Sequence, residues 1–236
     1  MIITLKKQYY PTGCKRIDNL LGGGFESQIV NHIYGESGTG KSIITLQCAY
    51  KAALKGFTTF YIDTERAFSA TRLNQIAQDN FSKVGKLIFV YAPLNFSQQM
   101  KIIQKLEKFI TKNVKIIILD TISALYSASY GINNPKRNYK LNKQLNHQMA
   151  ELVRLAENYD LAIIVNNQVR SRIADKDPRK LVPFNRNILD HWCKVQLFLT
   201  FSEKMDMKKR EAILIKHYNQ QNEKSCSFII SNEGCQ

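Results

Sequence analysis

The segment Ile33–Leu46 reads IYGESGTGKSIITL and places three glycines and a lysine between an apolar run and a helical pattern. Glycine at such positions costs conformational entropy and provides no side chain for packing. Residues Gly35–Ser42 fit the pattern G-x-x-x-x-G-K-[ST] in the strand–loop–helix context that it requires. In such a loop bare backbone N–H groups surround phosphate oxygens, and the N-terminus of the next helix adds partial positive charge. The segment therefore predicts a phosphate-binding loop.

The loop gives individual side chains a role in binding ATP and Mg²⁺. Lys41 reaches the β- and γ-phosphates, and the Ser42 hydroxyl ligates the metal ion. The predicted nucleotide-binding residues of the loop are Gly35, Glu36, Ser37, Gly38, Thr39, Gly40, Lys41 and Ser42. A chance glycine turn is the alternative, and the complete pattern in its proper context disfavours it.

Two carboxylates follow apolar runs further along the chain. Asp120 ends the run KIIILD, where a second Mg²⁺ ligand acting through a bound water is expected. A lone aspartate at a strand end is more often a cap, but the loop upstream favours the metal role. Glu65 follows the run TTFYID, and on its own such a glutamate is more often simply solvated.

Short apolar runs alternate with amphipathic stretches over the first two thirds of the chain. The expected strands are Ile29–Tyr34, Thr58–Asp63, Leu87–Ala92, Val114–Asp120 and Leu161–Val169. The helical patterns between them are Lys41–Lys55, Ala70–Asn80, Phe96–Lys112 and Asn138–Asn158. This alternation is typical of βαβ units and predicts an α/β fold with a mostly parallel sheet flanked by helices.

After Lys194 the pattern changes to three strand-like runs with short links. They are Val195–Phe201, Ala212–Tyr218 and Ser225–Ser231, and they predict an antiparallel extension of the same sheet. No linker or repeat interrupts the chain, so we expect a single domain.

The chain has 236 residues with 34 Lys+Arg against 19 Asp+Glu, a formal net charge of +15. Such an excess fits a polyanionic partner such as nucleic acid and equally fits a generally basic protein. The five cysteines are scattered without metal-ligand spacing, which favours a reducing compartment. Neither a signal peptide nor an apolar run of membrane-spanning length is evident, so the expected location is the cytoplasm, without membrane contact.

Two basic segments follow the carboxyl ends of predicted strands, where open α/β sheets place their ligands. Ser127–Lys143 contains four cations and no acid, and Arg170–Arg186 contains six cations against two aspartates. The residues with which we expect the chain to bind DNA are Lys136, Arg137, Lys140, Arg170, Arg172, Arg179, Lys180 and Arg186. Tyr126, Tyr130 and Tyr139 could stack on bases, although tyrosines near loops are more often partly buried anchors.

Four motifs in one order resemble the RecA/RadA recombinase superfamily, and most closely its short archaeal RadB branch. They are TGCKRIDNLLGGGFESQIVNHIYGESGTGKS, YIDTE, IIILDTISALY and IIVNNQV. The resemblance spans about Thr12 to Gly234 and implies a RecA-like P-loop ATPase core with ATP and Mg²⁺ as cofactors. It implies that Glu65 activates the attacking water and that Arg72 stacks on adenine. It also implies that Gln168 senses the γ-phosphate and begins the second of two DNA-binding loops.

The two basic segments fall on the two DNA loops of this superfamily. The resemblance further implies that His191 senses nucleotide across a filament interface, although a histidine packed beside Trp192 is an equal alternative. Full-length members carry an N-terminal helical domain and a docking segment ahead of the core. We expect neither here, and assign residues 1–236 to a single RecA-like ATPase domain with 1–11 as an extension.

The stretch IKHYNQQNEKS departs from the superfamily, whose members place an aspartate and prolines there to cap a neighbour's nucleotide. Lys216 and His217 are the remaining candidates for contacting a nucleotide in trans, should a homo-oligomer form. This departure predicts slow ATP hydrolysis with little stimulation by DNA. It favours an accessory role over strand exchange.

The leading hypothesis is an ATP-binding, weakly hydrolysing, DNA-binding accessory protein in homologous recombination and DNA repair. Its implied partners are single-stranded or branched DNA, bound without sequence preference, a RadA-type recombinase and a Holliday-junction resolvase. The alternative is a KaiC-like regulatory ATPase that acts through protein contacts without DNA. A helicase-type motor is weaker, because no arginine finger is evident.

Overall fold

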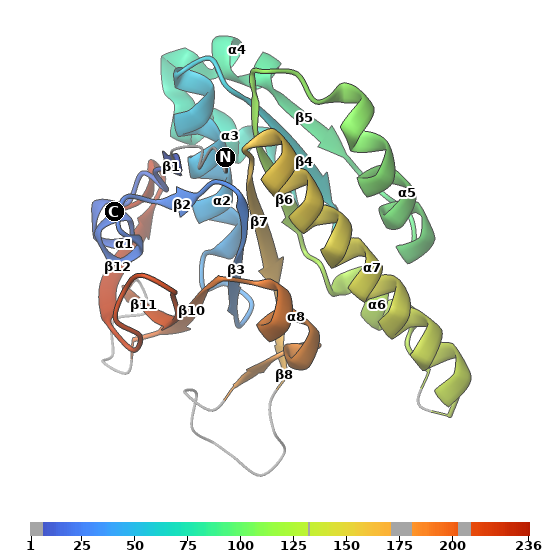
Figure 1. Ribbon diagram of the computed structural model, residues 1–236. Coiled ribbons are helices and arrows are strands. Elements are labelled where there is room, and N and C mark those ends of the chain that lie inside the picture. Colours follow the sequence, from blue (N-terminus) through green and yellow to red (C-terminus); the bar gives the residue numbers. More distant parts are fainter. Residues whose placement is uncertain (1–6, 132, 171–180, 203–208) are drawn as a thin grey trace, which may run out of the picture.

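The computed structural model describes residues 7–131, 133–170, 181–202 and 209–236 and contains a nine-stranded central sheet (Figure 1). Its strand order is β13-β12-β11-β10-β3-β7-β6-β4-β5. The strands are β3 (Ile29–Gly35), β4 (Thr58–Asp63), β5 (Ile88–Tyr91), β6 (Val114–Asp120), β7 (Ala162–Asn167), β10 (Val195–Phe201), β11 (Lys209–Lys216), β12 (Ser225–Ser231) and β13 (Gly234–Cys235). Strands β5, β4, β6, β7, β3 and β10 run parallel, and β11 to β13 extend the sheet antiparallel. The expected α/β class and antiparallel extension are confirmed.

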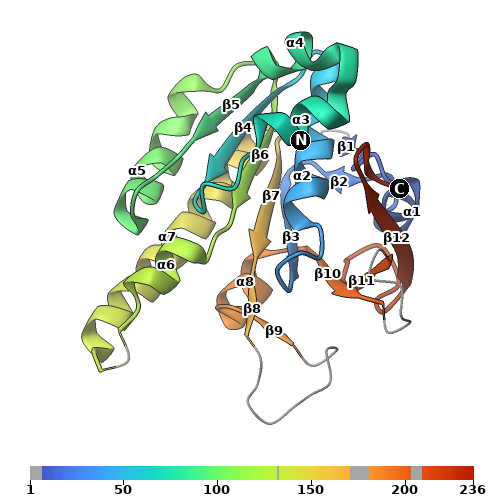
Figure 2. The same cartoon turned by 180° about the vertical axis from the view of Figure 1, so that it is seen from behind.

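Helices cover both faces of the sheet (Figures 1 and 2). The helices are α1 (Lys15–Leu21), α2 (Lys41–Leu54), α3 (Ala70–Ala77), α4 (Phe81–Val84), α5 (Phe96–Leu106), α6 (Ala124–Ser129), α7 (Pro135–Tyr159) and α8 (Arg186–Trp192). Short 3₁₀ turns lie at η1 (Gln78–Asn80), η2 (Gly85–Leu87) and η3 (Glu107–Phe109). Two antiparallel pairs lie outside the sheet, β1 (Tyr9–Tyr10) with β2 (Phe25–Glu26) and β8 (Val169–Arg170) with β9 (Val182–Pro183).

The central strand β6 shows why the sheet is buried on both faces. Ile116 and Ile118 pack into one apolar cluster with α1, α2 and α3, whereas Ile117 and Leu119 pack into the opposite cluster with α5, α7 and α8. Successive side chains of a strand point to opposite faces, so four consecutive apolar residues supply both clusters. The strand therefore ends at Asp120 between two packed layers.

The structure differs from the predicted elements mainly in the polar segments. The basic segment 127–143, expected as a DNA loop, is largely helical, because α7 begins at Pro135 with the Asn134 side chain accepting from the N–H of Arg137. Proline is well suited to the first turn of a helix, and the asparagine caps it. The expected strand 161–169 divides after Asn167, where the chain leaves the sheet for β8. Helices α1, α6 and α8 were not predicted; each is only six or seven residues long.

The end of the sheet at which β6 and β7 terminate carries the projecting parts of the molecule. Helix α6, the first half of α7 and the β8–β9 ribbon all extend past the sheet at this end (Figures 1 and 2). In the ranges that the structure describes, no helix has the length and apolar character needed to cross a membrane.

Candidate nucleotide site

The loop between β3 and α2 has little room for side chains on its backbone. A Cβ on Gly35 would lie 2.1 Å from the carbonyl oxygen of Leu199, and Gly38 and Gly40 adopt φ angles of 80° and 103°. These left-handed angles are strained for residues with a Cβ. The glycines of this loop are thus required by close approach to β10 and by the turn itself.

Lys41 begins α2 and turns its ammonium back into the loop. Its Nζ donates to the carbonyl oxygens of Gly35 (2.8 Å) and Glu36 (2.7 Å), and the side chain is buried. Burial lowers the pKa of Lys41, while the nearby carboxylates of Asp120, Glu65 and Glu36 oppose this shift. A buried ammonium held only by carbonyl dipoles is well placed to exchange them for phosphate oxygens.

A hollow of about 250 Å³ opens beside the loop, and we name it the P-loop hollow. Its lining residues are Ser37, Gly38, Gly40, Lys41, Ser42, Ile43, Glu65, Ala67, Asp120, Thr121 and Gln168. Among the other loop residues, Gly35 and Glu36 hold Lys41, and Thr39 hydrogen-bonds the Glu36 carbonyl through its hydroxyl (2.8 Å). The structure therefore gathers the predicted loop, metal and catalytic residues around one hollow.

Asp120 is fixed at the floor of this hollow by a tyrosine. The Tyr61 hydroxyl donates to Asp120 Oδ2 at 2.6 Å, and both side chains are buried. Burial, with the neighbouring carboxylate, raises the pKa of Tyr61 well above its ordinary value, so the hydroxyl remains a donor. An oriented carboxylate with the Ser42 hydroxyl on the same hollow is an oxygen donor set suited to Mg²⁺.

Two threonines hold the ends of β4 and β6 together beside Asp120. The Thr64 hydroxyl donates to the carbonyl oxygen of Thr121 (2.8 Å) and accepts from its N–H (2.7 Å). The Thr121 hydroxyl in turn donates to Glu65 Oε1 at 3.2 Å. This pair fixes the distance between the two acidic strand ends.

Glu65 is also contacted from the far side of the hollow by Gln168. The Gln168 amide nitrogen donates to Glu65 Oε1 at 2.5 Å. Glu65 is open to solvent, yet partial desolvation at the wall raises its pKa, against the lowering effects of Thr121, Lys41 and Gln168. The carboxylate is thus oriented by two donors and faces the space beside Lys41 and Asp120.

Arg72 does not line the P-loop hollow. Its guanidinium donates to the carbonyl oxygens of Ser231 and Asn232 and to the side chain of Gln75. In this structure the arginine therefore ties α3 to the turn between β12 and β13. Its role at adenine remains a prediction.

The three candidates for a trans contact also lie outside this hollow. The exposed ring of His191 meets Trp192 edge-on at 4.9 Å between centroids. Lys216 Nζ donates to the carbonyl oxygens of Asp190 (2.6 Å) and Cys193 (2.9 Å) at the end of α8. His217 is buried and its Nδ1 accepts two backbone N–H groups, so of the three only His191 is open to a neighbour.

The predicted DNA-binding cations that the structure describes gather at the projecting end of the molecule. Lys136, Arg137 and Lys140 are exposed on the first two turns of α7, and Arg170 lies over the Phe184 ring at 3.9 Å. Arg186 begins α8 and pairs with Asp190 at 3.0 Å. The remaining three, Arg172, Arg179 and Lys180, lie outside the described residues.

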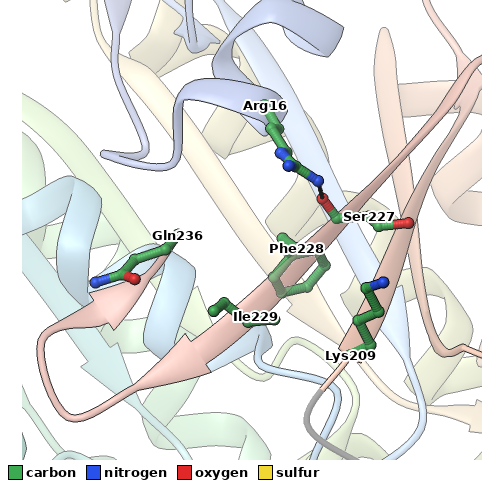
Figure 3. Close-up of a pocket in the computed structure, with 6 residues that line it drawn as sticks. All are labelled: Arg16, Lys209, Ser227, Phe228, Ile229 and Gln236. Carbon is green, nitrogen blue, oxygen red and sulfur yellow. Dashed lines mark hydrogen bonds between the residues drawn. The ribbon is translucent and has the colours of Figure 1, made fainter. Parts of the chain in front are cut away.

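A second basic hollow lies between α1 and strands β11 and β12 (Figure 3). It includes Arg16 and Lys209 but shares no residue with the P-loop hollow. Arg16 Nη1 donates to the carbonyl oxygen of Ser227 at 3.0 Å, a bond that holds α1 against β12. We regard this cation as a structural contact.

A glycine loop after β3, an aspartate ending β6 and a glutamate after β4, on a mostly parallel sheet, define a P-loop protein with a RecA-like core.

The chain belongs to the Rad51 family, whose model matches residues 6–236. It is 35% identical over 231 residues to the DNA repair and recombination protein RadB of Methanococcoides burtonii, with 98% of both chains covered. The RadB protein of Archaeoglobus fulgidus is also 35% identical over 231 residues, covering 98% of this chain and 99% of the relative. The crystal structure of the RadB recombinase superposes with a TM-score of 0.79 at 28% identity, over 96% of this chain and 98% of that one. The resemblance expected from the four motifs is confirmed.

Several residues of the site were not predicted from the sequence. Tyr61, Thr64 and Thr121 fix the acidic side chains, and Ile43 and Ala67 complete the lining. The sequence does contain a signal for the threonines, because the aspartate that ends β4 and the aspartate that ends β6 are each followed by a threonine. The register pairs Asp63 with Asp120, which brings the two threonines together.

Proposed function

We propose that this chain is an ATP-binding, weakly ATP-hydrolysing and DNA-binding accessory protein in homologous recombination and DNA repair, built as one RecA-like ATPase domain. The contact that carries the proposal is Gln168 on Glu65, because it joins the nucleotide site to the chain leading into β8 and the second basic segment. The RadB relatives are DNA repair and recombination proteins by name, which supports a role in those processes. A RadA-type recombinase and a Holliday-junction resolvase are the proposed protein partners, and a homo-oligomer is the proposed assembly.

In this proposal each residue of the P-loop hollow has one task. Bound ATP supplies the phosphoanhydride bond that is broken. Lys41 holds the phosphate charge, and Ser42 and Asp120 hold Mg²⁺. Glu65 accepts the proton of the attacking water. Gln168 orients the Glu65 carboxylate, and whether it keeps this contact depends on whether a γ-phosphate is present.

DNA binding is proposed for the exposed cations at the projecting end. Lys136 and Lys140 have no ion pair among the described residues, and no acid occurs between Asp120 and Glu151. Lys136 and Arg137 lie in the first turn of a long helix, where a cation is unfavourable by about 0.3–1 kcal/mol. An anionic backbone would relieve that repulsion.

The proposal predicts that DNA affinity falls steeply with salt and that these cations set the slope. Replacing Lys136, Lys140 and Arg170 together by alanine should flatten the slope by about two units, since each phosphate contact to a single strand contributes about 0.7. Titrations at two or more salt concentrations measure it. The matched control replaces Lys83, Lys86 and Lys112, which are exposed near the opposite ends of the strands. Equal slopes in both triple variants would place the DNA elsewhere, and no DNA binding by the wild type would refute the proposed function.

The proposal also predicts slow hydrolysis with little stimulation by DNA. The phosphate-binding and catalytic residues that this chain supplies itself line the P-loop hollow. Lys216 and His217, the candidates for contacting a neighbour's nucleotide, are instead engaged within their own chain. In related enzymes a cation supplied in trans contributes about 10³–10⁵ in rate. Turnover should be measured with and without single-stranded DNA over a range of protein concentrations. A large DNA-dependent rate that rises with protein concentration would show that a competent interface forms.

A further inference from the structure

The tip of the loop between β3 and α2 is contacted from outside by strands β10 and β11, which follow β3 in the sheet order (Figure 1). Gly35, the last residue of β3, pairs with Leu199, and Phe201 ends β10 two residues further on. Phe201 in turn pairs with Arg210, near the start of β11. These two side chains therefore stand beside the loop, although neither lines the P-loop hollow.

Arg210 makes a hydrogen bond to the backbone of the loop. Its Nε donates to the carbonyl oxygen of Gly38 at 3.3 Å. Its guanidinium carbon lies over the Phe201 ring, 4.5 Å from the ring centre. The same ring packs against the loop, since a Cβ added to Gly38 would lie 3.6 Å from Phe201 Cζ. The half-buried arginine is thus held by an aromatic ring at the point where it contacts the loop.

The carbonyl that Arg210 contacts belongs to the same peptide unit as the N–H of Thr39. In a planar trans peptide these two groups point in opposite directions. The cation outside the loop therefore directs the Thr39 N–H inward, where it meets the carbonyl oxygen of Glu36. Because Lys41 Nζ donates to the same oxygen at 2.7 Å, the backbone donor and the ammonium converge on one point.

The Thr39 N–H is well placed to exchange its acceptor for an anion. Its distance to the Glu36 carbonyl oxygen is 3.4 Å, longer than the usual range of about 2.7–3.2 Å. That oxygen already accepts the Thr39 hydroxyl and the Lys41 ammonium, whereas a phosphate oxygen is a stronger, charged acceptor. A cation on the carbonyl side also polarises the peptide, which strengthens its N–H as a donor.

We infer that Arg210 is a positioning residue of the nucleotide site. Seated on Phe201, it holds the peptide between Gly38 and Thr39 so that the Thr39 N–H donates to a phosphate of the bound nucleotide. Arg210 acts through the loop backbone and lies 172 positions along the chain from Gly38, outside the loop motif. The inference rests on the proposed ATP binding and adds to it a residue that fixes the loop from the sheet.

Arg210→Ala should weaken binding of a non-hydrolysable ATP analogue about fivefold, as measured by titration with Mg²⁺ present. The lost bond is charge-assisted, but the arginine is only half-buried, so the loss is smaller than for a fully buried ionic contact. The Thr39 N–H contacts the phosphate both before and during the reaction. KM should therefore rise by the same factor while kcat stays unchanged. Inorganic tripolyphosphate, which has no base or sugar, should also lose affinity about fivefold.

Arg16→Ala is the matched control. Arg16 also donates from its guanidinium to a strand carbonyl, that of Ser227 at 3.0 Å, but away from the loop. Both variants lose one such bond, so a purely structural role predicts equal effects, whereas the inference predicts that Arg16→Ala binds the analogue as the wild type does. Phe201→Ala should weaken binding in the same direction as Arg210→Ala, and Phe201→Tyr, which keeps the ring, should not.

Equal affinity for the analogue in Arg210→Ala and Arg16→Ala, or a lower kcat with an unchanged KM, would overturn the positioning role and leave the proposed function intact. If Arg210→Ala does not fold, the two Phe201 variants decide. A loss confined to Phe201→Ala supports the inference, and equal binding by both variants overturns it. Failure of the wild type to bind the analogue would overturn the proposed function itself.

Discussion

Lys41→Ala is expected to lower the affinity for a non-hydrolysable ATP analogue by about 10²–10³-fold. Charge-assisted hydrogen bonds contribute about 1.5–3 kcal/mol each, and Lys41 can direct more than one toward the phosphates. The variant also removes the counter-charge in a hollow that Glu65 and Asp120 share. The phosphates would then face the two carboxylates with Mg²⁺ as the remaining counter-charge. The lost attraction and the added repulsion both weaken binding.

A titration of the analogue with Mg²⁺ present measures this effect. Lys55→Ala is the matched control, because it removes the same charge from an exposed residue at the other end of α2. Its affinity should equal that of the wild type. If Lys41→Ala binds the analogue as tightly as the control does, the nucleotide is not bound at the P-loop hollow.

The sequence predicted the elements whose pattern is set by burial. The limits of strand β6 were predicted correctly. Its consecutive isoleucines are buried on both faces, and the charged residue that follows this apolar run ends the strand. The beginning of α7 was placed three residues late and its first turns were expected as loop. There the helix is specified by Asn134 and Pro135 rather than by apolar periodicity.

The site could be predicted as far as its local motif and no further. Residues 35–42 form a contiguous loop, so their pattern is legible in the chain. The contact between Glu65 and Gln168 joins residues 103 positions apart and depends on the strand order β4-β6-β7, which periodicity does not reveal. Likewise, the engagement of Lys216 with the end of α8 follows from how β11 packs, and its charge alone suggested a free cation.

The second large effect is expected at Glu65. Glu65→Gln should lower the rate of ATP hydrolysis by about 10²–10⁴-fold, the contribution of a positioned general base, and leave analogue binding nearly unchanged. The amide fills the same space and retains an oxygen that can accept from Thr121 and Gln168. What it loses is the capacity to take a proton from water.

A single-turnover assay with protein in excess over ATP measures the rate even when hydrolysis is slow. Glu157→Gln is the matched control, because Glu157 is exposed near the end of α7, away from the P-loop hollow. An unchanged rate in Glu65→Gln would remove Glu65 from the role of base. A loss of analogue binding in the same variant would show that Glu65 supports the loop itself.

The pH profile supplies a sharper criterion for the same residue. Glu65 must be ionised to accept a proton, and partial desolvation raises its pKa above the ordinary 4.5 in the ligand-free protein. Since kcat/KM reports groups of the free enzyme, its acid limb should lie above that value and the rate should fall as the pH decreases through it. Glu65→Gln has no titrating carboxyl there, so this limb should be absent from its residual activity. An acid limb that persists unchanged in the variant would assign the proton transfer to another group, and the orientation of Glu65 by Thr121 and Gln168 would then have only a structural purpose.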